Sequence, residues 1–159
     1  MGGHGIVAAA RIGIGVAIVA AVLAPGAVQA QTGKKFYGLT PCRVVDTRTS
    51  VDPAAVKRGN FADDEMRVYA LSTSTDCPGL PASAAAWSLN IQFRPLTQVA
   101  YVTTYPDGVG RPVVSTLVGY PDSWTINNAI VPAGPGGAID VYCQYAGRLI
   151  VDVNGYFAP

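Results

Sequence analysis

Three aspartates occur where apolar and polar residues alternate, and they offer the simplest catalytic chemistry in this sequence. Glycoside cleavage needs only two acidic groups flanking the scissile bond, so Asp46, Asp140 and Asp152 are candidates for a small glycosidase or lyase. An ion pair or turn hydrogen bond with Arg43 or Arg48 would instead use two of these carboxylates, Asp46 and Asp152, to join the first strand to the last. We favour this structural role for both residues.

Other catalytic arrangements lack a required member. The only histidine is His4, which lies in the apolar N-terminal segment that we expect to be removed as a signal peptide. The mature chain that remains would have no histidine, so it cannot form Ser-His-Asp or Cys-His arrangements or His-containing zinc and copper sites. We therefore expect no catalytic residue, no metal and no cofactor, and we expect a protein that is not an enzyme.

The three cysteines, Cys42, Cys77 and Cys143, are too far apart in sequence for a metal-binding CxxC motif. In an oxidising compartment, one disulfide and one remaining thiol are expected. Cys42 and Cys77 lie beside Pro41 and Pro78 at expected strand edges, and so we predict that they form the bridge. Cys143 lies in an apolar strand and is left either buried or free to link two chains.

Aromatic side chains could form a carbohydrate-binding surface, because exposed rings stack on the apolar faces of sugars. Tyr101 and Tyr105 share one strand face, which points outward if Val102 points inward, and Tyr120 and Trp124 follow at the next turn. The alternative, which we favour, places these rings at the rim of the fold as amphipathic side chains.

Other polar pairs have local explanations. Asn154 and Gly155 form a strong signal for a turn or bulge, and together with Thr47 they belong to the structural motifs at the two ends of the domain. The pairs at 115–116 and 127–128 could contact a ligand. Polar residues on one side of a strand more often face water or bond neighbouring backbone groups.

The first 30 residues have the pattern of a secretory signal peptide. Arg11 precedes an apolar run of roughly 13 residues, whereas a membrane-spanning helix needs about 20. Small residues at Val28 and Ala30 suit cleavage before Gln31. A retained anchor is the alternative. Cleavage leaves one extracellular domain, residues 31–159, on a secreted or cell-surface protein.

The mature domain is electrically balanced. Loss of Arg11 leaves ten Lys and Arg residues against ten Asp and Glu residues, without a basic stripe or an acidic tail. Nucleic acids and anionic membrane surfaces are therefore poor partners.

The elements that would position these residues are strands, because the dominant period after the signal is two. In the clearest strand, Trp87, Leu89, Ile91 and Phe93 alternate with polar residues. Gly- and Pro-rich turns separate the strands, and residues 50–65 form a long polar loop. This pattern predicts an all-β, antiparallel two-sheet sandwich, jelly-roll-like in one version, with a closed barrel as the alternative. The expected strands are residues 42–47, 66–72, 84–94, 99–105, 113–118, 124–131, 138–145 and 148–153.

Motifs at both ends resemble those of a known family. Residues 36–48 contain Thr-Pro-Cys-Arg-Val-Val-Asp-Thr-Arg, and residues 149–157 contain Asp-Val-Asn-Gly-Tyr-Phe, with Asn-Asn-Ala-Ile-Val at 127–131. The chain resembles an uncharacterised secreted β-domain of actinobacteria, acidobacteria and proteobacteria with TPCRxxDTR-like opening and DVNGYF-like closing motifs. The resemblance implies an extracellular accessory module and no agreed reaction. Between the motifs, residues 103–105 and 121–124 depart from the usual pattern.

The leading hypothesis is a non-enzymatic extracellular module with a structural, adhesive or assembly role. Its partners would be proteins or its own copies, with a glycan as the alternative. A carbohydrate-binding module using Tyr101, Tyr105 and Trp124 is the second hypothesis, and a small glycosidase or lyase is the third.

Overall fold

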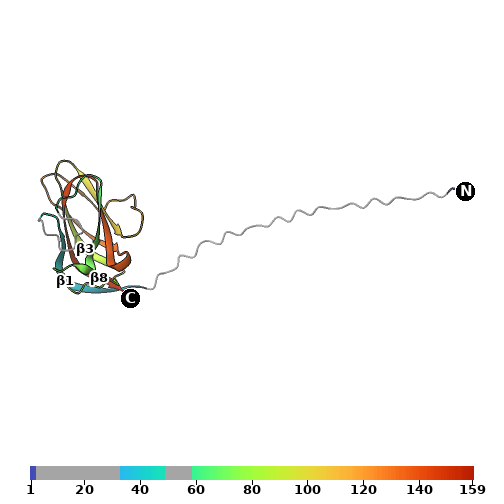
Figure 1. The fold of residues 1–159 in the computed structure, drawn as a ribbon, viewed down its shortest axis with the longest axis horizontal. Helices are drawn as coiled ribbons and strands as arrows, with labels where there is room; N and C mark the ends of the chain where they lie inside the picture. Colours follow the sequence, from blue (N-terminus) through green and yellow to red (C-terminus); the bar gives the residue numbers. More distant parts are fainter. Residues whose placement is uncertain (3–32, 49–58) are drawn as a thin grey trace. The chain divides into compact units, whose positions relative to one another are not determined.

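A computed structural model describes residues 1–2, 33–48 and 59–159. The predicted signal peptide and the first part of the predicted 50–65 loop therefore lie outside the described residues. Two antiparallel four-stranded sheets pack as a β-sandwich (Figure 1), so the predicted fold class is confirmed. In the part of the chain that the structure describes, no helix is long and apolar enough to span a membrane.

The two sheets have the strand orders β1-β8-β3-β6 (sheet A) and β2-β7-β4-β5 (sheet B). Because most successive strands change sheet, this is a jelly-roll arrangement of eight strands. Two short 3₁₀ turns, η1 (Leu71–Thr73) and η2 (Pro135–Gly137), lie between strands. The strands are β1 (Lys35–Asp46), β2 (Glu65–Ala70), β3 (Ala86–Pro95), β4 (Ala100–Pro106), β5 (Leu117–Gly119), β6 (Thr125–Pro132), β7 (Ala138–Cys143) and β8 (Gly147–Ala158).

The core lies between the sheets and follows the alternation in the sequence. Trp87, Leu89, Ile91 and Phe93 of β3 are fully buried, while the residues between them are partly exposed. The Trp87 ring nitrogen donates a hydrogen bond to the Gly137 carbonyl at 2.8 Å, which satisfies its one polar atom inside the core. β3 is a central strand of sheet A, so its outward residues lie in the middle of that sheet's outer face.

The first and last strands are longer than predicted. β1 begins at Lys35 and β8 continues to Ala158, because the two strands pair from Lys35 opposite Ala158 to Asp46 opposite Ile150, with two register shifts in between. The Asn-Gly signal marks a bulge: the β3–β8 register shifts where Asn154 has no partner. A Cβ at Gly155 would lie 2.4 Å from the ring of Phe36, so this glycine permits the close approach of the two strands.

The predicted strand at 113–118 is wrong in most of its length. Only Leu117–Gly119 forms a strand, and residues 107–116 instead cross the outer face of sheet B. There, the Thr103 hydroxyl donates to the Val114 carbonyl at 2.6 Å and the Arg111 guanidinium lies 3.7 Å from the Tyr142 ring centre. Pro112 has no N–H for a strand ladder, and Val113 is fully exposed, so its apolar character does not report burial.

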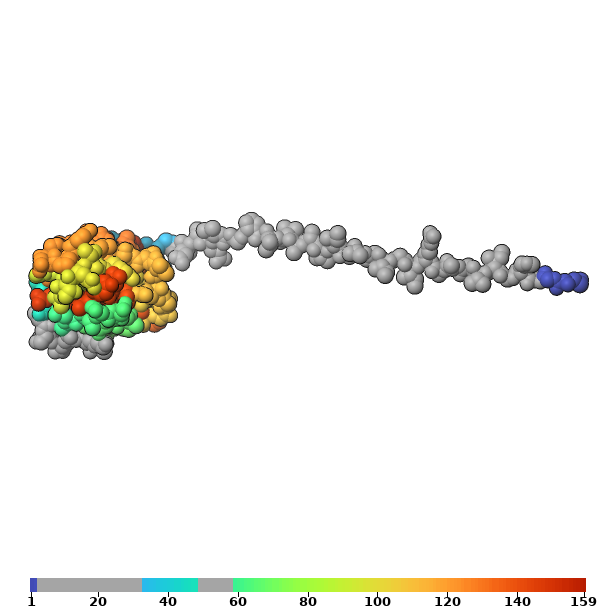
Figure 2. All heavy atoms as spheres, turned by 90° about the horizontal axis from the view of Figure 1, so that it is seen from above, coloured from blue at the N-terminus to red at the C-terminus, as the bar shows by residue number. Residues whose placement is uncertain are grey.

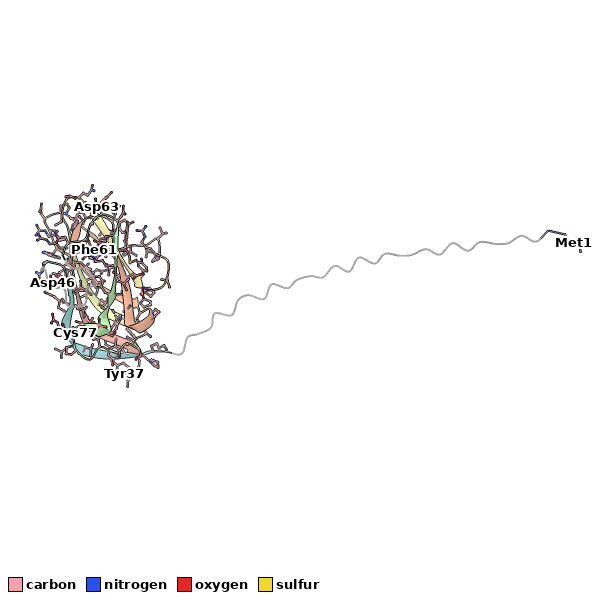
Figure 3. All side chains as sticks on the ribbon, in the orientation of Figure 1. Met1, Tyr37, Asp46, Phe61, Asp63 and Cys77 are labelled. Carbon is pink, nitrogen blue, oxygen red and sulfur yellow. A yellow bond between two sulfur atoms is a disulfide. The ribbon has the colours of Figure 1, made fainter. Side chains whose placement is uncertain are left out.

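The predicted disulfide is confirmed: Cys42 of β1 is bonded to Cys77, with 5.7 Å between the Cα atoms. Figure 3 labels Cys77 between Tyr37 and Asp46 along β1. Cys143 is a free, fully buried thiol in the core, which agrees with the buried alternative and leaves no exposed free thiol to link two chains.

The end of the predicted 50–65 loop is held in place. Phe61 is buried in the core, and its N–H donates to the Gly147 carbonyl at 2.8 Å. The Arg67 guanidinium lies 3.9 Å from the Phe61 ring centre and donates to the Gly59 and Asn60 carbonyls. This part of the segment therefore belongs to the packed fold.

Candidate binding face

The opening and closing motifs meet on the outer face of sheet A. Arg43 of β1 lies opposite Asp152 of β8, and its Nε donates to Asp152 Oδ1 at 2.8 Å. A second bond joins Arg43 to Asp152 Oδ2 at 3.3 Å. β1 and β8 lie at opposite ends of the sequence, so this bidentate ion pair helps to set the register of the first strand against the last.

Asp46 is the last residue of β1, and its carboxylate accepts hydrogen bonds from two arginines. Arg48 donates to both Asp46 oxygens, at 2.9 and 2.6 Å, and Arg43 donates to Oδ2 at 3.4 Å. The hydrogen bonds from Arg48, opposed by partial burial, lower the pKa of the Asp46 carboxyl. Thr47 is buried beside it and exchanges hydrogen bonds with the backbone of Leu149. These contacts explain the conjunction of Asp, Thr and Arg in the motif.

The hydrogen bonds continue across β3 to β6 through three amide side chains. Gln92 donates to Asp152 Oδ2 at 3.5 Å and to Asn90 Oδ1 at 3.3 Å. Asn90 in turn donates to Asn128 Oδ1 at 3.0 Å. The contacts therefore run from one edge strand of the sheet to the other.

We call this set the polar row. It consists of planar guanidinium, carboxylate and amide groups, and each group is hydrogen-bonded to the next. The surface is therefore ordered before any partner binds. Its two arginines and two aspartates balance in charge, which favours hydrogen bonding over charge attraction as its mode of recognition. The polar row consists of Arg48, Asp46, Arg43, Asp152, Gln92, Asn90 and Asn128.

Apolar side chains border the polar row. The Arg48 guanidinium lies 5.9 Å from the ring centre of Trp124, which is half-buried just before β6. Along β6, Ile126 and Ile130 flank Asn128 and are 56% and 65% exposed. Large apolar side chains this exposed on a strand are unusual for a surface that meets only water.

The four aromatic candidates do not form one platform. Tyr101 and Tyr105 do lie on the outer face of sheet B, since Val102 points into the core. Tyr105, however, is only 6% exposed because that face is covered, so its ring is not available for stacking. Tyr120 is exposed in the turn after β5, and Trp124 lies by the polar row of the other sheet.

Tyr101 lines a groove between sheet B and the segment that crosses it. The groove has a volume of about 490 Å³ and is mainly apolar. Arg111 contributes the only charge among its lining residues, and its guanidinium already rests on the Tyr142 ring. The lining residues are Tyr101, Arg111, Pro112, Val113, Val114, Ser115 and Val118.

Asp140, the third carboxylate candidate, is separate from the other two. It lies in β7 opposite Tyr105, is only 4% exposed, and its Oδ1 has no hydrogen-bond partner. Burial, followed by the nearby Asp107 carboxyl, raises the pKa of Asp140. In the part of the chain that the structure describes, no three His, Cys, Asp or Glu side chains are placed to hold a metal ion.

The sequence signalled the ends of the polar row but missed its middle. From the sequence, Asn90 and Gln92 were identified only as solvent-facing residues of a strand. Their link to Asp152 depends on the β3–β8 register, which the sequence does not report. The polar pairs at 115–116 and 127–128 mostly bond backbone: the Thr104 N–H donates to Thr116 Oγ1, and Asn127 donates to the Thr116 carbonyl. Asn128 is the exception that joins the polar row.

No protein-family model and no curated protein matches the chain.

Proposed function

We propose that this chain is a secreted or cell-surface module without catalytic activity, which acts by binding and serves a structural, adhesive or assembly role. The observation that carries the proposal is the polar row, a partly exposed and internally hydrogen-bonded surface across four strands. The carboxylates that a glycosidase or lyase would need, Asp46 and Asp152, are held by arginines within it, which argues against the catalytic alternative.

Three features support export. The Cys42–Cys77 disulfide is consistent with an oxidising compartment. The N-terminal segment has the composition of a signal peptide. The motifs at the two ends resemble those of a secreted bacterial domain. An exported protein is exposed to cell-surface proteins and glycans, and not to intracellular metabolites.

The test is binding of the fluorescently labelled protein to intact cells of the bacterium that produces it. The double variant Asn90→Ala, Gln92→Ala removes the middle of the polar row, while Met66→Ala changes an exposed side chain of sheet B and serves as the control. We expect the double variant to lose binding at least fivefold and the control to bind like the wild type. Equal binding by all three, or no binding at all, would overturn the proposal.

A carbohydrate partner is the second candidate, and the position of Trp124 favours it. A half-buried indole beside the Arg48 end of the polar row can stack on a sugar ring while the polar row bonds its hydroxyl groups. On a glycan array, Trp124→Ala should abolish binding that Tyr101→Ala retains, because Tyr101 lies on the opposite sheet. An array without any bound glycan would remove this candidate.

A further inference from the structure

The edge strand β6 differs from the other three sheet edges. β1 has two register shifts and carries Pro41, β2 has six residues with Glu65 and Arg67 among them, and β5 has three residues. Charges, bulges, prolines and short length are the devices that keep sheet edges from pairing with other chains. β6 has eight residues, no charge, no register shift, and a proline only at its last position.

The hydrogen-bonding groups on the free side of β6 belong to its outward-facing residues. The Ala133 N–H donates to the Ala85 carbonyl at 3.0 Å, so the odd-numbered residues of this regular antiparallel strand turn their N–H and C=O toward β3. Those of Ile126, Asn128 and Ile130 consequently point away from the sheet. Among the described residues, β6 pairs with β3 alone.

These three residues are arranged symmetrically, since Asn128 is two positions from each isoleucine. We infer that β6 pairs antiparallel with β6 of a second copy of this chain, about a two-fold axis at Asn128. In this register Asn128 faces Asn128 of the other copy, and Ile126 faces Ile130 on both sides of the axis. All three pairs are hydrogen-bonded ones, and two four-stranded sheets become one of eight strands.

The side chains fit this partner. The four isoleucines, exposed in the single copy, would form two apolar cross-strand pairs, which stabilise antiparallel strands. The two Asn128 amides can donate to and accept from each other, so the polar row would continue from one copy into the next. A charged or strongly polar partner strand would leave the isoleucines in water, and β6 carries no charge to attract it.

The segment that precedes β5 contacts β6, since the Asn127 amide of β6 donates to the Thr116 carbonyl. In Figure 2 the orange part of the chain, which includes β6, lies on the surface of the domain. Three residue pairs form a small interface, so we expect reversible association in the micromolar range.

This inference rests on the proposed function, of which it names the partner, and cysteine cross-linking tests its geometry. At the two-fold axis the Cα atoms of the paired residues lie about 5.5 Å apart, within disulfide range. Asn128→Cys should therefore give a disulfide-linked dimer under mild oxidation. Ile126→Cys should give no disulfide-linked dimer, because the two copies of position 126 are about 13 Å apart along the strands. A mixture of Ile126→Cys and Ile130→Cys proteins should cross-link again.

Sedimentation over a concentration series gives an independent readout. The wild type should shift from monomer to dimer, and Ile126→Lys with Ile130→Lys should weaken association at least tenfold. Met66→Lys, on the β2 edge, should leave it unchanged. A wild type that stays monomeric up to millimolar concentration, or a dimer that Ile126→Cys cross-links as well as Asn128→Cys, overturns the inference. If the wild type stays monomeric but still binds to cells, the inference fails and the proposed function stands.

Discussion

The three aspartates considered for catalysis have opposite effects on stability. Asp46 and Asp152 both accept hydrogen bonds from arginines, and for Asp46 these bonds favour the ionised form in the folded state. Asp140 is buried with one oxygen unpaired, so its ionised form is disfavoured. The residue type alone cannot distinguish these cases, because the difference depends on which strand lies alongside.

Replacement of Asp46 by Asn should lower the free energy of unfolding by about 1–2 kcal/mol at pH 7, because hydrogen bonds to a charged group are lost and both arginines remain. The folded-state pKa of Asp46 is lowered by Arg48, so its contribution is complete above the ordinary pKa of about 3.9. It is lost as pH falls through the lower folded value. Urea denaturation at several pH values measures both effects.

The control for this change is Asp122→Asn, because Asp122 pairs with Arg94 through a side chain that is 92% exposed. An exposed pair contributes little, so the change should stay within about 0.5 kcal/mol. If the two variants lose equal stability, Asp46 does not have the structural role assigned to it.

Replacement of Asp140 by Asn should have the opposite sign and raise the free energy of unfolding by about 1–3 kcal/mol at pH 7. The pKa of Asp140 is raised by burial and by Asp107, so the folded state binds its proton more tightly than the unfolded state. The carboxylate therefore costs stability above its ordinary pKa, and this cost vanishes as pH falls below it. The gain should disappear near pH 3 in the same urea series, and a loss of stability at pH 7 would contradict the argument.

Among the elements, the sequence predicted those whose apolar residues face the core. β3 was clear because Trp87, Leu89, Ile91 and Phe93 alternate without interruption, and all four are buried. Residues 113–118 misled because Val113 and Val114 are apolar yet exposed. The extension of β1 to Lys35 and the middle of the polar row depend on which strands become neighbours, and alternation within one strand cannot report this.

The disulfide ties β1 to the segment that precedes β3, across 35 residues. Closing a loop of this length in the unfolded chain should stabilise the fold by about 4 kcal/mol by chain entropy. The double variant Cys42→Ser, Cys77→Ser should lose stability of this size in denaturant titrations. Wild type measured in reducing agent should match it, whereas Cys143→Ala should respond to reducing agent as the wild type does. Stability unchanged by reduction would show that the bridge does not constrain the unfolded chain.

At the scale of the whole molecule, the two outer faces differ. Sheet A presents the polar row to solvent, while the segment 107–116 crosses sheet B and contacts Thr103 and Tyr142. One face is therefore open to a partner, and the other is already occupied in part by the chain itself. This asymmetry concentrates the proposed binding on sheet A and its β6 edge.

Cys143 reports on the cohesion of the whole fold. Its thiol is fully buried between the sheets, and burial raises its pKa, so the reactive thiolate is nearly absent in the native state. Alkylation should therefore require global unfolding, and its rate at saturating reagent should equal the unfolding rate measured in denaturant and extrapolated to water. Val99→Cys, at a position 48% exposed, should react at the rate of a free thiol and serves as the control. Labelling of Cys143 faster than unfolding would reveal a local opening between the sheets. A Cys143-linked dimer should correspondingly appear on non-reducing gels only after the protein has been unfolded.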